Sequence, residues 1–283
     1  MDRSSAVSFI QSIASEEDAF DVLEKNMDGI SPLQLMDSLL HCGIIPEQYA
    51  HDSSEEKLWA KYCDILLNKS FNLMDIRSEV IRVRGDSADI RGVTSAYSIV
   101  ADAKAFRLSR TAKNQKDFKI SALDDWRRGD TYACLVAPLY QYPVQRSQIY
   151  EQAESRNVTL LSYIHLRFLL DKTLPESLET LWNTAASLTP GQNARRYWEA
   201  VDDSVVAVTD SSYRELRSYK QQAIDAAREV GREGISYWES VKQDYRLLSK
   251  EAAISKLIKA EKIDQKIDSI AKSISTVSKI LDA

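Results

Sequence analysis

Short apolar runs alternate with turn-forming residues in the middle of the chain, a pattern that predicts β-strands. The runs are rich in β-branched residues, and Gly85 and Gly92 interrupt the first of them. This composition is typical of strands joined by turns. Two or three adjacent strands are predicted from the runs at residues 78–83, 88–93 and 97–101, and two further strands at residues 132–137 and 158–163.

A helix is predicted between the last two strands, at residues 147–156. A strand, a helix and a second strand in this order form a crossover connection within one sheet. The middle of the chain is therefore predicted to be an α/β domain built on a mixed sheet.

Helical signals precede this predicted sheet. The Ser-Pro pair at residues 31–32 places a capping residue before a proline at the first helical position. Ser53 and Glu56 match a capping box ahead of an apolar series that should continue to about Leu73. Residues 1–45 are expected to form short helices, followed by one long helix.

Long helices are also predicted for the C-terminal part, because strand signals disappear after Glu176 and neither proline nor glycine follows Gly234. The last helix has an apolar stripe with alternating steps of four and three, the spacing of a coiled-coil seam. The stripe consists of Ile263, Ile267, Ile270, Ile274, Val277 and Leu281. We favour packing within the chain over a subunit interface, because the stripe is shorter than the three or four heptads that indicate a coiled coil.

The predicted fold class is α/β, with a mixed-sheet core flanked by helices and with helical regions at both ends. We expect an N-terminal helical segment at residues 1–48, an α/β core at residues 49–175 and a helical C-terminal region at residues 176–283. A chain of 283 residues is long enough to bury one large core.

Composition limits the classes of protein that remain. Hydrophobic residues make up 44% and charged residues 28%, which is ordinary globular usage. The three cysteines have no metal-ligand spacing, so a zinc site or disulfide framework is not expected and a reducing cytoplasm fits best. No apolar run has the length of a membrane span or signal peptide. The net charge of −5 does not exclude DNA as a ligand, because local basic patches decide DNA affinity.

Two acidic residues and a lysine form the strongest candidate for chemistry. Asp89 is followed thirteen residues later by Asp102-Ala103-Lys104, the D…(D/E)xK form that many metal-dependent nucleases use. Side chains alternate along a strand, so Asp102 and Lys104 should share a face, and Asp89 on a neighbouring strand could complete the cluster. The triplet alone is a weak signal, since similar triplets occur elsewhere in the chain, and solvated charges at a strand end remain an alternative.

Basic residues recur at every third position after this triplet. Six cations stand against only two acids, Asp102 and Asp117, in a protein that is acidic overall. Phosphate contacts with DNA would require such a local charge, although a solvated basic loop is the alternative. The six cations are Lys104, Arg107, Arg110, Lys113, Lys116 and Lys119.

The segment from Val100 to Lys119 resembles the corresponding segment of the HindIII family of type II restriction endonucleases. Further similarity is visible at residues 45–47, 137–143 and 160–170. The resemblance implies the PD-(D/E)xK restriction-endonuclease-like fold, in a cytoplasmic bacterial enzyme. It further implies a homodimer that uses Mg²⁺, or Mn²⁺ in its place, and no nucleotide cofactor. Such an enzyme would cut double-stranded DNA at the palindrome AAGCTT after the first A, leaving 5′-phosphates. The helical C-terminal region would then serve dimerisation or embrace the DNA.

The same resemblance implies roles for individual residues. Asp89, Asp102, Lys104 and Asp117 fall on catalytic positions, and Asp89, Asp102 and the carbonyl of Ala103 would bind the metal. The groups expected to contact DNA are Arg107, Arg110, Ala112, Lys113, Asn114, Lys116 and Asp117. Asparagine suits adenine and lysine suits guanine, in agreement with a site that contains A and G.

Several positions depart from the family pattern or stay open. Arg82 stands where the family carries an acid, and Asp86 is an additional carboxylate close to Asp89. Glu56 could reach the site from its helix, but its capping role explains it adequately. Whether Asp117 supports the metal site or reads bases is also open.

Two rival functions belong to other classes. One is a sequence-specific DNA-binding protein of the same fold without hydrolysis, which retention of both acids and Lys104 disfavours. The other is a helical scaffold, which leaves the basic segment unexplained. A modification methyltransferase is disfavoured because the chain lacks a glycine-rich cofactor loop. The isolated histidines and the tryptophans are expected to be structural.

Overall fold

The computed structural model describes residues 2–82, 87–110 and 115–270. The chain divides into two units, residues 1–234 and 235–283. The long helix α11 (Tyr213–Arg246) begins in the first unit and ends in the second. The domain bounds expected from the sequence stay a prediction.

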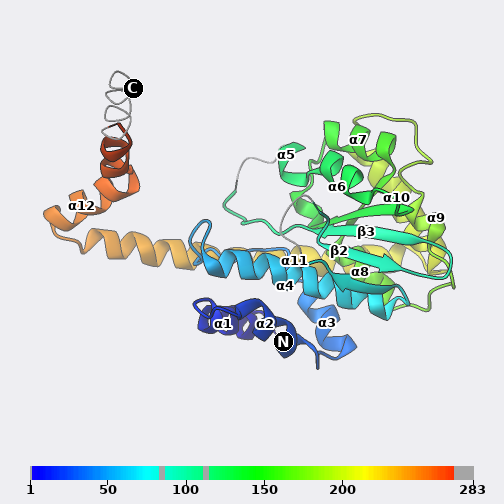
Figure 1. Ribbon diagram of the computed structural model, residues 1–283, viewed down its shortest axis with the longest axis horizontal. Helices are drawn as coiled ribbons and strands as arrows, with labels where there is room; N and C mark the ends of the chain where they lie inside the picture. The colour runs from blue at the N-terminus through cyan, green and yellow to red at the C-terminus, as the bar shows by residue number, and fades with distance from the viewer. Residues whose placement is uncertain (1, 83–86, 111–114, 271–283) are drawn as a thin grey trace, which may run out of the picture. The chain divides into compact units, whose positions relative to one another are not determined.

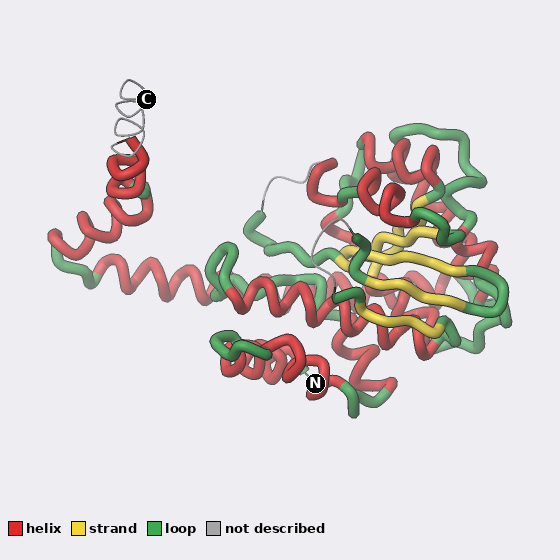
Figure 2. Tube along the Cα trace, in the orientation of Figure 1, coloured by secondary structure: helices red, strands yellow, loops and turns green. Residues whose placement is uncertain are grey.

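A five-stranded mixed sheet forms the centre of the first unit, with the strands in the order β1-β2-β3-β4-β5 (Figures 1 and 2). The pairs β1–β2 and β2–β3 are antiparallel, whereas β3–β4 and β4–β5 are parallel. The α/β class and the mixed sheet predicted from the sequence are confirmed. The strands are β1 (Arg77–Val80), β2 (Ile90–Val93), β3 (Ser98–Ala103), β4 (Tyr132–Ala137) and β5 (Val158–Ser162).

Helices cover both faces of this sheet. Figure 1 shows α6 and α7 on one side and α4 and α8 on the other. Helices α6 and α7 lie in the connections between parallel strands, as expected for crossovers. The bounds are α4 (Ser54–Leu73), α5 (Gln115–Phe118), α6 (Ile120–Arg127), α7 (Gln148–Arg156) and α8 (Tyr163–Leu170), with a 3₁₀ turn at Leu139–Gln141.

The sequence explains which strands are covered on both faces. Every residue of β4 and β5 is buried, as their continuous apolar runs predict for parallel strands covered on both faces. The outer strand β1 is largely accessible. At the other edge, the Tyr197 hydroxyl accepts a hydrogen bond from the Leu160 amide at 2.8 Å, which satisfies a donor that the edge strand would otherwise leave unpaired.

The first three helices of the chain are short and pack against α4. These are α1 (Arg3–Ile13), α2 (Ala19–Met27) and α3 (Pro32–Leu39). Helix α3 begins with the predicted cap: Ser31 and Gln34 form a capping box, and proline occupies the first turn. The predicted box of α4 forms only in part. Ser53 accepts the Glu56 amide, but the Glu56 carboxylate accepts the amide of Asp52, which has a positive φ of 60°, in place of the amide of Ser53.

Strand β3 extends further than predicted. Its expected end was residue 101, but the strand continues to Ala103, and Asp102 pairs in register with Leu135 of β4. The amide of Lys104 then donates to the carbonyl of Val136 at 2.8 Å. Parallel pairing with β4 therefore carries the acid into the sheet, and local polarity alone does not end the strand. Strand β1 ends at Val80, short of the prediction, and residue 83 lies outside the described residues.

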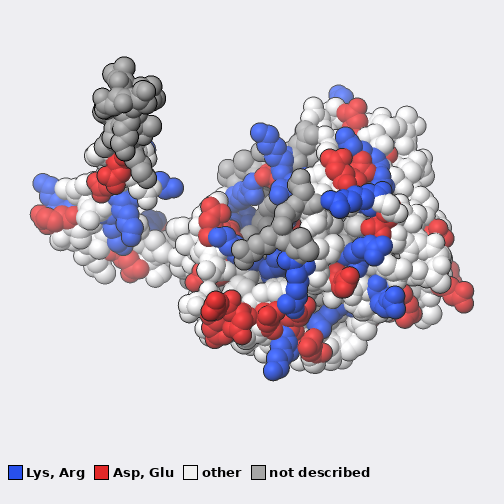
Figure 3. Space-filling model, in the orientation of Figure 1, with Lys and Arg blue, Asp and Glu red and all other residues white. Residues whose placement is uncertain are grey.

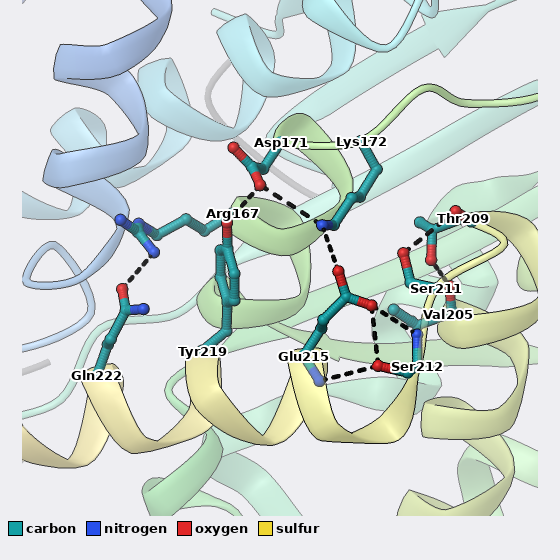
Figure 4. A network of polar contacts seen from close by, with 10 residues as sticks. All are labelled: Arg167, Asp171, Lys172, Val205, Thr209, Ser211, Ser212, Glu215, Tyr219 and Gln222. Carbon is teal, nitrogen blue, oxygen red and sulfur yellow. Dashed lines mark hydrogen bonds and ion pairs between the residues drawn. The ribbon is translucent and has the colours of Figure 1, made fainter.

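Helices account for the rest of the first unit, as predicted. They are α9 (Glu179–Trp182), α10 (Ala194–Val208) and the first part of α11. Polar contacts fix the start of α11 against α8 (Figure 4). Lys172 contacts Glu215 at 3.2 Å, and the Tyr219 hydroxyl donates to Asp171 at 2.5 Å.

The second unit contains α12 (Lys250–Ala260) and a further helical stretch at residues 263–270. Ile263, Ile267 and Ile270 of the predicted apolar stripe are 40%, 58% and 61% exposed. This exposure differs from the packing within the chain that we favoured, because few groups of the described second unit cover this helix. The remaining stripe residues, Ile274, Val277 and Leu281, lie outside the described residues.

Other expectations about the core can also be compared with the structure. The three cysteines are buried thiols. Trp59 and Trp182 are in the core as expected, but Trp238, which belongs to the second unit, is 48% exposed. Within the described ranges, no helix is long and apolar enough to cross a membrane.

Candidate active site

The antiparallel pairing of β2 with β3 brings the two predicted acids together. Ile90 pairs with Ala101, so Asp89, immediately before β2, lies beside Asp102. The carbonyl of Asp89 accepts the Ile81 amide at 2.8 Å, which fixes its backbone to the chain after β1. Strand register therefore places both acids at the same end of the sheet, as the sequence predicted.

Asp102 and Lys104 form an ion pair at the end of β3. The Asp102 side chain is fully buried, and its Oδ1 atom accepts a hydrogen bond from Lys104 Nζ at 2.5 Å. Its Oδ2 atom contacts the same ammonium group but accepts no hydrogen bond from any residue described. The carbonyl of Lys104 accepts the hydroxyl of Tyr163 at 3.0 Å. Tyr163, at the start of α8, thus fixes the backbone that carries the lysine.

The two acids titrate differently because their surroundings differ. Burial, helped by the charge of Asp89 and opposed by that of Lys104, raises the pKa of Asp102 to about 7. Burial also favours a higher pKa for Asp89, but hydrogen bonding with Asp102 and the charges of Lys61 and Lys104 outweigh it, so that the pKa of Asp89 is lowered. A proton retained on Asp102 relieves the repulsion between two adjacent carboxylates.

Two residues that the sequence reasoning missed adjoin this pair. Lys61 of α4 places its Nζ 2.9 Å from Asp64 Oδ2 and 3.2 Å from Asp89 Oδ1. The Asp64 side chain is only 4% exposed, and burial raises its pKa well above the usual value, with a further contribution from Asp89. The sequence did contain one signal for Asp64: it is a charged residue within the largely apolar stretch Tyr62–Phe71, which is mostly buried in α4.

Arg107, expected to contact DNA, forms an ion pair and hydrogen bonds with other residues of the protein. Its guanidinium contacts Glu56 at 2.9 Å and donates to the carbonyls of Tyr49 and Ala50 at 2.6 and 3.3 Å. The Arg107 side chain is 15% exposed. Glu56, a candidate for reaching the metal site, is thus engaged by Arg107 and by the amide of Asp52.

The next part of the basic segment is fixed in a similar way. The carboxylate of Glu47 accepts the amide and the hydroxyl of Ser109 at 3.0 and 2.7 Å. Arg110 pairs with Asp117 and lies over the ring of Phe106. Lys116 is exposed at the start of α5. Ala112, Lys113, Asn114 and Asp86 lie outside the described residues.

A second group of possible metal ligands lies at the surface. Ligand atoms of His51, Asp52 and Glu56 lie within 4.8 Å of one another. His51 and Asp52 are each 82% exposed, and Glu56 is bound by Arg107. Arg82 likewise pairs with Asp21 and Glu24 of α2. These contacts have the character of surface ion pairs.

The fold and this site define a class of protein. A mixed sheet flanked by helices carries two acids and a lysine at one end, as in the restriction-endonuclease-like fold. Carboxylates so placed can hold a divalent cation, and the lysine can bind a phosphate.

Comparison with known proteins agrees with this class. The family model described as HindIII restriction endonuclease matches residues 11–275. The type II restriction enzyme HindIII of Haemophilus influenzae is 37% identical over 242 residues, which cover 81% of this chain and 79% of that protein. The chain belongs to the HindIII restriction endonuclease family.

Proposed function

We propose that the protein is a type II restriction endonuclease that hydrolyses phosphodiester bonds in double-stranded DNA. The ion pair of Asp102 and Lys104 with Asp89 beside it, in a chain of this family, is the observation that carries the proposal. A restriction enzyme of this kind would act in the bacterial cytoplasm, where incoming DNA is encountered.

A divalent ion, Mg²⁺ or Mn²⁺, is proposed to bind Asp89, Asp102 and the carbonyl of Ala103. The donor set fits, because carboxylate and carbonyl oxygens are the ligands such ions prefer. The buried Asp102 Oδ2, which accepts no hydrogen bond among the described residues, has a lone pair to offer. Such an ion stabilises negative charge on the reacting phosphate and lowers the pKa of a bound water.

The chain's own residues would orient the reactants. Lys104 would leave Asp102 to hold the scissile phosphate and orient the attacking water, and Tyr163 keeps its backbone in place. Attack in line with the leaving oxygen gives 5′-phosphate and 3′-hydroxyl ends. Asp117 would act through Arg110, its ion-pair partner in the basic segment.

Sequence recognition is proposed to lie in the basic segment, at Arg110, Ala112, Lys113, Asn114, Lys116 and Asp117. Arg107, for which the sequence suggested a DNA contact, would instead support this segment through Glu56. Figure 3 shows Lys and Arg side chains interspersed with Asp and Glu over the visible part of the face drawn. We propose the palindrome AAGCTT, cut after its first A, as the site. Two-fold symmetry of a palindrome calls for a homodimer in which each subunit cuts one strand.

A plasmid with a single AAGCTT sequence tests the function. Wild-type protein should linearise it with Mg²⁺ but not with EDTA, and sequencing of the ends should show the cut after the first A. Lys104→Ala should slow cleavage by about a thousandfold or more, as loss of a charge-stabilising group does. Lys57→Ala is the matched control, since Lys57 is exposed on α4, outside the ion pairs described at the site.

The alternative function is sequence-specific DNA binding without hydrolysis. Intact plasmid with every divalent ion tried, together with retention of an AAGCTT duplex in a gel shift, would establish that alternative. Cleavage at another sequence would retain the nuclease and overturn only the proposed specificity.

A further inference from the structure

Lys61 lies between two carboxylates that belong to different parts of the fold. Its Nζ is 2.9 Å from Asp64 of the same helix and 3.2 Å from Asp89, which precedes β2. Asp64 is buried, while the side chains of Lys61 and Asp89 are 38% and 32% exposed. The ammonium group thus links α4 to a proposed metal ligand.

The contact with Asp89 exceeds what the stability of α4 requires. A buried Asp64 needs one counter-charge, and Lys61, three residues earlier on the helix, can supply it alone. The second contact reaches 28 positions along the chain. Each carboxylate of the cluster lies against an ammonium group: Asp64 and Asp89 against Lys61, and Asp102 against Lys104.

We propose that Lys61 is a built-in cation, a positioning residue that occupies the place between Asp64 and Asp89 where a divalent ion would otherwise bind. The proposal rests on the proposed function, in which Asp89 binds the metal from its other side. The ammonium group neutralises Asp64 and holds Asp89 toward Asp102 without needing an ion from solution. It also prevents Asp64 from drawing a divalent ion away from the reacting phosphate.

Removal of the ammonium group should turn this place into a divalent-ion site. Asp64 and Asp89 would then face each other without a counter-charge, and two carboxylates completed by water form an ordinary environment for Mg²⁺ or Mn²⁺. Lys61→Met, which keeps an unbranched side chain of similar size but removes the ammonium group, should therefore bind an additional ion per subunit. Lys61→Arg retains the charge and should bind as many ions as the wild type.

Mn²⁺ binding to the full chain, measured by electron paramagnetic resonance as ions bound per subunit, tests this inference. We expect the additional ion in Lys61→Met and its loss again in Lys61→Met/Asp64→Asn. Lys57→Met, one helical turn away, is the matched control and should equal the wild type. Circular dichroism melting shows which variants are folded. If Lys61→Met does not fold, Lys61→Gln, which keeps a hydrogen-bond donor for Asp64, takes its place with the same expectation.

An equal number of ions in wild type and folded Lys61→Met or Lys61→Gln would overturn the proposal. An additional ion that persists in the double variant would also overturn it, because Asp64 would not be a ligand. Asp102→Asn tests the proposed metal centre separately. If that variant binds as much Mn²⁺ as the wild type, the proposed function loses its metal site, whereas the comparison of Lys61 variants still reports on the place between Asp64 and Asp89.

Discussion

Arg110 and Asp117 form an ion pair that joins the two described ends of the basic segment. The Asp117 side chain is 11% exposed and that of Arg110 is 42% exposed. Four residues between them lie outside the described residues. The pair therefore fixes the ends of the stretch in which base recognition is proposed, and it gives Asp117 a definite structural partner.

Asp117→Asn should weaken DNA binding more than metal binding. The variant removes the charge that holds Arg110, so the proposed recognition segment is less well ordered before it meets DNA. We expect about a tenfold lower affinity for an AAGCTT duplex, as for loss of a single good contact. Gel shifts in Ca²⁺ measure the affinity and Mn²⁺ titration measures the metal. Loss of Mn²⁺ binding with unchanged DNA affinity would instead place Asp117 at the metal.

Arg107→Ala should destabilise the protein with little effect on phosphate contacts. Arg107 is largely buried against Glu56 and two carbonyl groups, so its removal leaves buried polar groups unpaired, at a cost of about 2–3 kcal/mol in the free energy of unfolding. The dependence of DNA affinity on salt should equal that of the wild type.

The variant Lys116→Ala serves as the comparison for Arg107→Ala, because it should change DNA binding and not stability. Lys116 is exposed, and loss of one phosphate contact should reduce the slope of log affinity against log salt by about 1. Urea unfolding and gel shifts at several salt concentrations separate the two variants. A reduced slope for Arg107→Ala would show that Arg107 reaches the DNA after all.

Local patterns were sufficient to predict most of the sheet and part of the site. The continuous apolar runs of β4 and β5 predict that both strands are buried, as the structure shows. Asp89 and Asp102 could be predicted as neighbours because a short connection joins adjacent antiparallel strands, and the pairing of Ile90 with Ala101 then sets the register.

Contacts over long sequence separations could not be predicted in this way. Lys61 and Asp64 precede Asp89 by more than twenty positions, and only the packing of α4 on the sheet brings them to it. Arg107 has the sequence character of a DNA contact, but its partner Glu56 lies 51 positions earlier. A helical pattern shows which face is apolar, but it does not show what a polar residue on that face contacts.

Gly43→Ala should disturb the support of Lys104. A Cβ atom at Gly43 would lie 2.5 Å from Pro138 Cγ and 2.8 Å from Tyr163 Cε2, and Tyr163 holds the carbonyl of Lys104. Overpacking of this kind costs about 1–3 kcal/mol. We expect a lower urea midpoint and slower cleavage.

Gly29→Ala is the control for Gly43, because a Cβ atom there meets nothing within 4 Å. Its urea midpoint and cleavage rate should stay close to those of the wild type. If Gly43→Ala unfolded and cleaved like Gly29→Ala, Tyr163 would not be in the place described.

His165 should make stability depend on pH below neutrality. Burial lowers the pKa of His165 from 6.5, while Asp202 opposes the shift and Lys220 adds to it. Nδ1 accepts the Ser162 amide at 3.1 Å, so Nε2 donates to Asp202 at 3.1 Å and the ring is neutral. Protonation of Nδ1 would break the hydrogen bond that caps α8.

The lowered pKa of His165 fixes the sign of this dependence. As pH falls through 6.5, the unfolded chain takes up a proton that the folded chain does not, so the free energy of unfolding decreases. The slope is at most about 1.4 kcal/mol per pH unit for one histidine. Burial also lowers the pKa of His41, which contributes in the same direction.

Urea unfolding between pH 7.5 and 5.5 compares His165→Gln with the wild type. The variant should be less stable at pH 7.5, because Ser162 loses its acceptor, but it should lose less stability on acidification. His41 and the buried carboxyl groups with raised pKa values, such as Asp102, are present in both proteins, so the difference in slope reports His165. An identical slope in the two proteins would mean that His165 takes up its proton in the folded state as readily as in the unfolded one.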